Sequence, residues 1–117
     1  MRRTALVGLA TLIMSLTIMQ ASWAVGGTVT IRFNHDTEVF HGKVQSANAE
    51  CRVARVVKLF KVTAAGREAQ GKVSTSDTGT WKIELMHAQG NYIAIAPKHE
   101  GMHATCDRLA SSTLDVM

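Results

Sequence analysis

The segment Thr80-Trp81-Lys82-Ile83-Glu84-Leu85 decides the fold class of this chain, because apolar and polar residues alternate along it without interruption. Successive side chains of a β-strand point to opposite faces, so the pattern predicts a half-buried strand with Trp81 in the core. Asp77-Thr78-Gly79, just before it, is the sharpest turn signal in the chain. The chain is therefore expected to turn at 77–79 and then enter a strand.

The same pattern recurs on both sides of this segment, separated by turn signals at intervals of about ten residues. From Val25 onward no segment sustains a helical period. We therefore expect an all-β fold of about seven strands, packed as an antiparallel Greek-key sandwich. Gly42 indicates a bulge or a close approach of another backbone. The strands are expected at residues 28–33, 39–44, 53–62, 69–75, 81–85, 92–96 and 106–116, with loops at 46–50 and 98–105.

The longest run, residues 53–62, has two predicted faces. Val57 and Leu59 share one face, and Arg55 joins it nearer the strand end. The opposite face carries Val56, Lys58 and Phe60.

A set of basic residues lies in and around the same run: Arg52, Arg55, Lys58, Lys61 and Arg67. A continuous positive strip would favour binding of an acidic surface polymer or an anionic lipid. Alternation, however, turns Arg55 away from Lys58. Charged side chains on a sheet edge also discourage pairing with other sheets, so a solvated edge is the ordinary interpretation.

The first 24 residues have the three parts of a secretory signal. Arg2 and Arg3 supply positive charge, residues 5–19 are apolar or small, and Ser22-Trp23-Ala24 fits the cleavage site. We expect a signal peptide over 1–24 and a single β-sandwich domain over 25–117. The apolar run of about 15 residues is shorter than the roughly 20 needed for a membrane anchor. The mature domain is expected to have no membrane span and to be secreted or periplasmic.

Net charge and cysteine content indicate which partners and which cross-links to expect. The full chain has a formal net charge of +4, and loss of Arg2 and Arg3 leaves +2, too little to predict a nucleic-acid partner. Cys51 and Cys106 both lie in the mature part, and an exported pair is interpreted first as a disulfide. Two free thiols or a two-cysteine metal site are the alternatives.

Two segments carry a resemblance to a known family. Thr75-Ser76-Asp77-Thr78-Gly79-Thr80-Trp81 and Gln89-Gly90-Asn91-Tyr92-Ile93-Ala94 resemble the "T-D-x-x-G-x-W/F … G-x-Y-x-A" stretch of carboxypeptidase-regulatory-like domains, which are prealbumin-like (transthyretin-like) β-sandwiches. Phe40-His41-Gly42-Lys43-Val44 and Val56-Val57-Lys58-Leu59 fall where that family has its "G-x-V" and "V-x-V" strands. Cys51 and Cys106 look like the cysteine pair of a secreted bacterial variant.

The resemblance implies a prealbumin-like fold and a non-catalytic module for folding, cell-surface assembly or ligand display. The family has no common catalytic residues to transfer, so we expect no enzyme activity and no cofactor. The expected partner is a protein or polymer of the cell envelope or extracellular space.

His99-Glu100-Gly101-Met102-His103 has the H-E-x-x-H spacing of zinc peptidases. That spacing works on a helix, which places both histidines on one face. Here the segment follows Pro97, contains a glycine and lacks a third ligand, so we expect a loop. A second hypothesis is a small periplasmic copper- or zinc-binding protein that uses His99, Met102 and His103, with His87 as a further candidate. Solvated loop histidines are the simpler interpretation.

Overall fold

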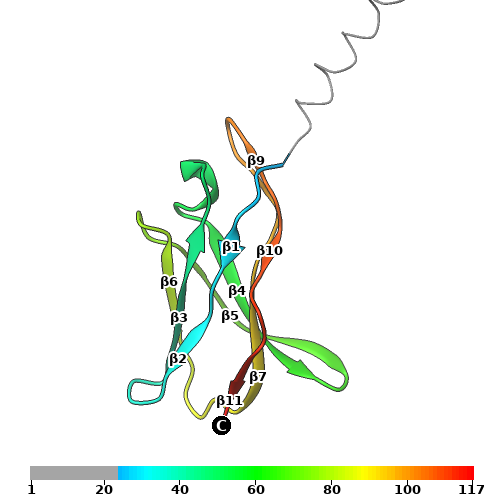
Figure 1. Ribbon diagram of the computed structural model, residues 1–117. Helices are drawn as coiled ribbons and strands as arrows, with labels where there is room; N and C mark the ends of the chain where they lie inside the picture. Colours follow the sequence, from blue (N-terminus) through cyan, green and yellow to red (C-terminus); the bar gives the residue numbers. More distant parts are fainter. Residues whose placement is uncertain (1–23) are drawn as a thin grey trace, which may run out of the picture.

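The computed structural model describes residues 24–117, which form an all-β domain (Figure 1). The predicted signal peptide lies, except for Ala24, outside the described residues. Two antiparallel sheets pack against each other around one core without closing into a barrel, an arrangement that is sandwich-like. Within the described residues, no helix has the length and hydrophobicity needed to cross a membrane.

The described residues contain eleven strands and one short 3-10 helix, η2 (Ala49–Cys51). In chain order the strands are β1 (Thr28–Val29), β2 (Arg32–Asn34), β3 (Val39–Gln45), β4 (Val56–Thr63), β5 (Gly66–Ser74), β6 (Thr80–Glu84), β7 (Gly90–Ala96), β8 (His99–Glu100), β9 (Thr105–Cys106), β10 (Leu109–Ala110) and β11 (Leu114–Val116).

The first sheet is built around β3, which pairs with β1 and β2 along one edge and with β6 along the other. Strands β1 and β2 correspond to the single strand predicted at 28–33. Between them, the Thr30 N–H still donates to the Lys43 carbonyl at 3.0 Å. At Gly42 the backbone of β3 closely approaches the backbone of Thr30. A close approach was one of the two alternatives predicted for this glycine. A Cβ at this position would collide with the carbonyl oxygen of Thr30.

The second sheet has the order β10-β7-β4-β5, and β11 continues along the same edge of β7 as β10. The edge strand predicted at 69–75 is β5, which begins earlier, at Gly66. Its register with β4 shifts between Leu59 and Phe60, where β5 contains one extra residue. Strand β4 begins at Val56 and not at Val53, because residues 52–54 form a turn with Ala54 at a φ of 52°.

The core lies between the sheets, and it confirms the predicted alternation. Phe40, Val44 and Trp81 come from the first sheet, whereas Val57, Leu59, Tyr92 and Ala94 come from the second. All seven are at most 2% exposed. Val56, in contrast, is 40% exposed on the opposite face of β4. The Phe40 ring lies 4.7 Å from the Tyr92 ring, centroid to centroid, and so links the two sheets.

Two predictions near the C-terminal end were wrong in detail. Residues 98–105, expected as a loop, contain β8 and the start of β9, which pair as a small antiparallel hairpin. The single strand expected at 106–116 is divided into β9, β10 and β11. The break between β10 and β11 has a physical cause at Ser111, whose hydroxyl accepts a hydrogen bond from the Ala94 N–H at 2.9 Å. A side chain thus replaces a backbone carbonyl in the ladder.

Candidate functional site

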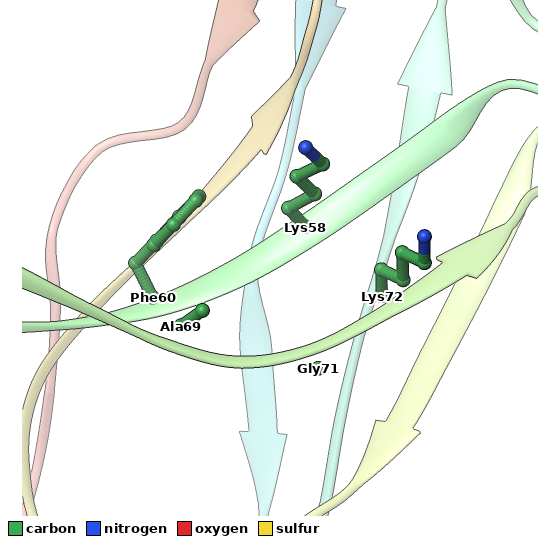
Figure 2. A pocket seen from close by; sticks show the side chains of 5 residues that line it. All are labelled: Lys58, Phe60, Ala69, Gly71 and Lys72. Atoms are coloured by element: carbon green, nitrogen blue, oxygen red, sulfur yellow. The ribbon is translucent and has the colours of Figure 1, made fainter.

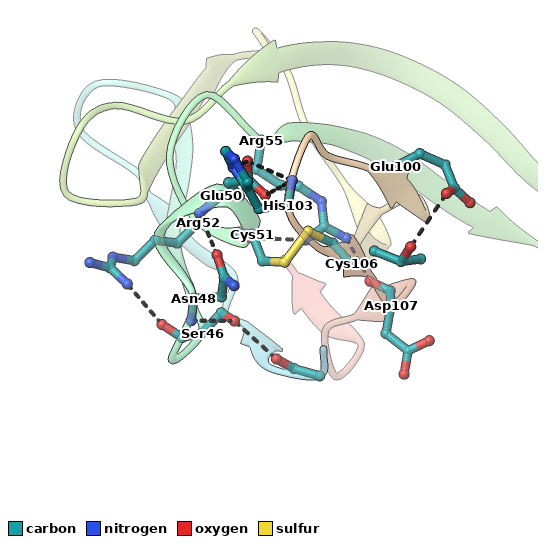
Figure 3. The surroundings of a disulfide bond; sticks show 12 residues. Ser46, Asn48, Glu50, Cys51, Arg52, Arg55, Glu100, His103, Cys106 and Asp107 are labelled. Atoms are coloured by element: carbon teal, nitrogen blue, oxygen red, sulfur yellow. Dashed lines mark hydrogen bonds and ion pairs between the residues drawn. A yellow bond between two sulfur atoms is a disulfide. The ribbon is translucent and has the colours of Figure 1, made fainter. Parts of the chain in front are cut away.

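The predicted disulfide is present and joins η2 to β9 (Figure 3). The Cys51 and Cys106 Cα atoms lie 5.4 Å apart, and the two residues are 1% and 0% exposed. The alternatives of free thiols and of a two-cysteine metal site are therefore wrong. Disulfides persist in oxidising environments, so this bond is compatible with an extracellular or periplasmic location.

Arg55 lies beside the disulfide and is only 2% exposed. Its guanidinium donates hydrogen bonds to the backbone carbonyls of Cys51 at 2.9 Å, Pro97 at 2.9 Å and Asp107 at 2.6 Å. Burial lowers the pKa of Arg55, and the nearby charge of Asp107 opposes that effect. Arginine stays charged even so, and the three carbonyls stabilise the buried cation. Arg55 therefore has a structural role at this end of the domain.

Glu50 connects the same two segments on the surface. Its carboxylate accepts hydrogen bonds from the His103 backbone N–H at 2.9 Å and from the His103 ring Nδ1 at 3.2 Å. The first of these contacts is the main reason why the pKa of Glu50 is lowered. Because Glu50 precedes Cys51 in η2 and His103 lies three residues before Cys106 of β9, this contact holds together the two segments that the disulfide joins.

The H-E-x-x-H segment is not helical, as its sequence context predicted. His99 and Glu100 form β8, and the chain then turns at Gly101 toward β9. The Glu100 carboxylate pairs with the Lys98 ammonium at 3.5 Å, while His103 is held by Glu50. The spatial arrangement that a zinc peptidase requires is therefore not formed.

The histidines and the methionine proposed as metal ligands lie on the surface. His99 and Met102, together with Glu50, line a hollow of about 500 Å³, and Met102 is 87% exposed. His87 belongs to the segment that connects β6 and β7, and this segment lies at the opposite end of the domain from β9 (Figure 1). In residues 24–117, no group of three or more His, Cys, Asp or Glu side chains is placed to hold a metal ion.

The basic residues do not form one strip. Arg55 is buried, and Arg52 donates a hydrogen bond to the Ser46 carbonyl at 3.0 Å. Lys58 instead faces Lys72, because these two residues are register partners on β4 and β5. Sequence reasoning missed Lys72, since the pairing depends on the extra residue in β5. Lys58 was visible in the sequence as one of the basic residues, but its register with β5 was not.

A hollow of about 310 Å³ lies next to this lysine pair on the outer face of the second sheet (Figure 2). It is lined by Lys58, Phe60, Ala69, Gly71 and Lys72. Figure 2 shows both lysine side chains rising on the same side from neighbouring strands. The hollow thus combines two ammonium groups with an aromatic and aliphatic lining.

The fold and the disulfide define the class of this protein as a small, disulfide-linked, sandwich-like all-β domain. Comparison of the chain with protein-family models, curated proteins and solved structures found no match.

Proposed function

We propose that this protein is an exported, non-catalytic β-sandwich module that acts by binding a protein or polymer of the cell envelope or extracellular space. The observation that carries the proposal is the buried Cys51–Cys106 disulfide. A structural disulfide of this kind is rare in reducing compartments. The signal-peptide pattern in residues 1–24 also supports export.

The use of the polar side chains favours binding over catalysis. Arg55 holds three backbone carbonyls, Ser111 completes a strand ladder, and Glu50 fixes the segment around His103. Each of these groups is therefore engaged in maintaining the fold. The resemblance of residues 75–81 and 89–94 to carboxypeptidase-regulatory-like domains supports a prealbumin-like topology and a role in ligand display or surface assembly.

Export and disulfide formation are tested together in a Gram-negative host that expresses the full chain. The expected result is a periplasmic or extracellular product that begins after Ala24, with thiols that react with maleimide only after reduction. A Cys51→Ser/Cys106→Ser variant is the control for labelling. Cytoplasmic retention, or reactive thiols in the native product, would contradict the proposal.

The binding role is tested by cross-linking the exported protein in intact cells of the host that encodes it. We expect a discrete envelope or extracellular partner that disappears when the protein is added in excess without cross-linker. Finding only self-linked or unlinked protein would count against a partner.

A second candidate function, metal binding, is favoured by one observation. His99 and Met102 line the same hollow as Glu50, which contacts His103. Calorimetric titration with Cu²⁺ and Zn²⁺ tests it against a His99→Ala/His103→Ala variant. His35→Ala/His87→Asn removes two other histidines as a matched control, and Asn tolerates the positive φ of residue 87. A dissociation constant weaker than about 10 μM, or one unchanged in the first variant, would exclude this function.

A further inference from the structure

We propose that the outer face of the second sheet binds an amphipathic anion, namely a single-chain carboxylate of the fatty-acid type. Its head group would lie between Lys58 and Lys72, and its chain would lie over Phe60 and Ala69. This inference rests on the binding role proposed above and gives that role a ligand class.

The lysine pair is the first observation. Lys58 and Lys72 are directly opposite each other on adjacent strands, and like charges in such positions destabilise a sheet. The only ion pairs among residues 24–117 are Lys98–Glu100 and His103–Glu50, so neither lysine has a carboxylate within 4.0 Å. A carboxylate ligand between the two ammonium groups would remove this repulsion.

Protection of a sheet edge does not account for both lysines. Lys72 lies on β5, an edge strand, where a charged residue discourages pairing with another sheet. Lys58 lies on β4, which is paired on both sides by β5 and β7. The β-bulge determines this pairing: if the register of Phe60 with Ala69 continued unshifted along the two strands, Lys58 would be opposite Gly71.

The apolar surface beside the lysines is the second observation. Phe60 is half-buried and is the register partner of Ala69, and both line the hollow of about 310 Å³. On the other side of β4, Ile95 is opposite Lys58 and Ile93 is opposite Phe60. Ile95 is only 5% exposed although it is not part of the core cluster between the sheets. Because Ile95 is already covered, the apolar surface that a ligand could contact beside the lysines is that of Phe60 and Ala69.

The charge distribution orients the ligand. A second hollow of about 290 Å³ shares Lys58 and Lys72 with the first and is also lined by Arg55, Lys98 and His99. Arg55 is buried and Lys98 is paired with Glu100, so Lys58 and Lys72 supply the accessible positive charge, and Phe60 and Ala69 line only the first hollow. A polymer with uniform negative charge would leave the apolar side unmatched. A flat membrane surface would leave the concave lining unfilled.

Sodium laurate below its micelle concentration is the probe, titrated calorimetrically into the purified protein with its disulfide intact. We expect saturable binding with a dissociation constant on the order of 0.1 mM. Acetate has the head group without the chain, and dodecyltrimethylammonium has a chain with the opposite charge. Both are expected to bind much more weakly than laurate.

The matched variants identify the site. Lys58→Gln/Lys72→Gln is expected to weaken laurate binding about tenfold, or about 1.4 kcal/mol. Lys43→Gln/Lys82→Gln removes the same charge from exposed positions of the first sheet. This control variant is expected to change the affinity for laurate by less than about twofold. Phe60→Ser is expected to weaken binding of laurate while leaving the weak acetate signal unchanged. Thermal unfolding confirms that each variant is folded.

Four results would overturn the inference. These are no saturable binding of laurate, equal affinity for dodecyltrimethylammonium, equal losses in the two double-lysine variants, and binding only to vesicles that contain phosphatidylglycerol. None of these results would alter the outcome of the export, thiol-labelling and cross-linking experiments, so failure of the ligand site is distinguishable from failure of the proposed function.

Discussion

The Arg55 guanidinium Nη2 donates a 2.6 Å hydrogen bond to the backbone carbonyl of Asp107, which is 52 residues away in sequence. The same side chain also reaches the carbonyls of Cys51 and Pro97. One buried cation thereby joins η2, the end of β7 and the segment after β9. Buried carbonyls that lose such a donor are expensive to leave unpaired.

The first prediction follows from that geometry. Arg55→Met keeps much of the side-chain volume but leaves the three carbonyls without their donor. We expect a loss of about 3 kcal/mol in the free energy of unfolding, measured by urea denaturation of the oxidised protein. Arg67→Met, at an exposed position of β5, is the control and should change it by less than about 0.5 kcal/mol. Equal effects would show that Arg55 has no special role.

The second prediction concerns the disulfide. It closes a loop with a sequence separation of 55 residues. The chain-entropy argument gives a stabilisation of about 4 kcal/mol for a loop of this size. The free energy of unfolding, measured by urea denaturation, should therefore be lower by about that amount in the presence of reductant. The Cys51→Ser/Cys106→Ser variant should have the same free energy of unfolding as the reduced protein. A reduced protein as stable as the oxidised one would contradict this.

The third prediction concerns pH. Contact with His103 lowers the pKa of Glu50 from 4.5, so the unfolded state binds more protons than the folded state between the two pKa values. The stabilising contribution is present above pH 4.5 and is lost as the pH falls through the folded pKa. Wild type should therefore exceed Glu50→Gln in unfolding midpoint at pH 6, and the difference should shrink below pH 4.5. Glu84→Gln, which removes an exposed carboxylate from β6, is the control. If the difference in unfolding midpoint between wild type and Glu50→Gln did not vary with pH, the stabilising role of the Glu50 carboxylate would be refuted.

The fourth prediction uses the opposed lysines. Lys58→Gln removes like-charge repulsion with Lys72, so we expect an increase of about 0.2–1 kcal/mol in the free energy of unfolding. Added salt screens the repulsion, and it should stabilise the wild type more than the variant. Lys43→Gln, on the first sheet, should give neither effect. A loss of stability in Lys58→Gln would mean that the repulsion is not significant.

The fifth prediction concerns Gly42. A methyl group there would meet the Thr30 carbonyl and come within 2.8 Å of the Trp81 Nε1, which donates to that same carbonyl. Gly42→Ala should therefore cost about 2–4 kcal/mol in the free energy of unfolding. Gly26→Ala is the matched control, because a Cβ at Gly26 has no neighbour within 4 Å. Similar stabilities of the two variants would show that the strands can separate at little cost.

The local alternation of apolar and polar residues was sufficient to predict which side chains of these strands are buried. Trp81, Val57 and Leu59 are buried as expected, because period-two burial is encoded within each strand. The breaks between strands were less predictable. Ser111 divides the last strand by a side-chain hydrogen bond to Ala94, and serine also occurs in uninterrupted strands.

Features that depend on two distant segments could not be predicted in this way. The pairing of Lys58 with Lys72 requires the register shift, which has no signature in either strand alone. Arg55 was correctly assigned to the inner face of the strand. Its acceptors, however, are backbone carbonyls, which every residue has, so its partners could not be identified from residue types.

The location of the disulfide constrains the order in which the domain can assemble. Cys106 pairs with Cys51, Val25 exchanges backbone hydrogen bonds with Thr105 and Asp107, and β11 completes the edge of β7. Segment 105–116 therefore supplies contacts to the beginning, the middle and the end of the domain. A chain that lacks this segment would leave the Cys51 thiol without its partner and would remove the Asp107 carbonyl from the acceptors of Arg55, so native closure must await segment 105–116.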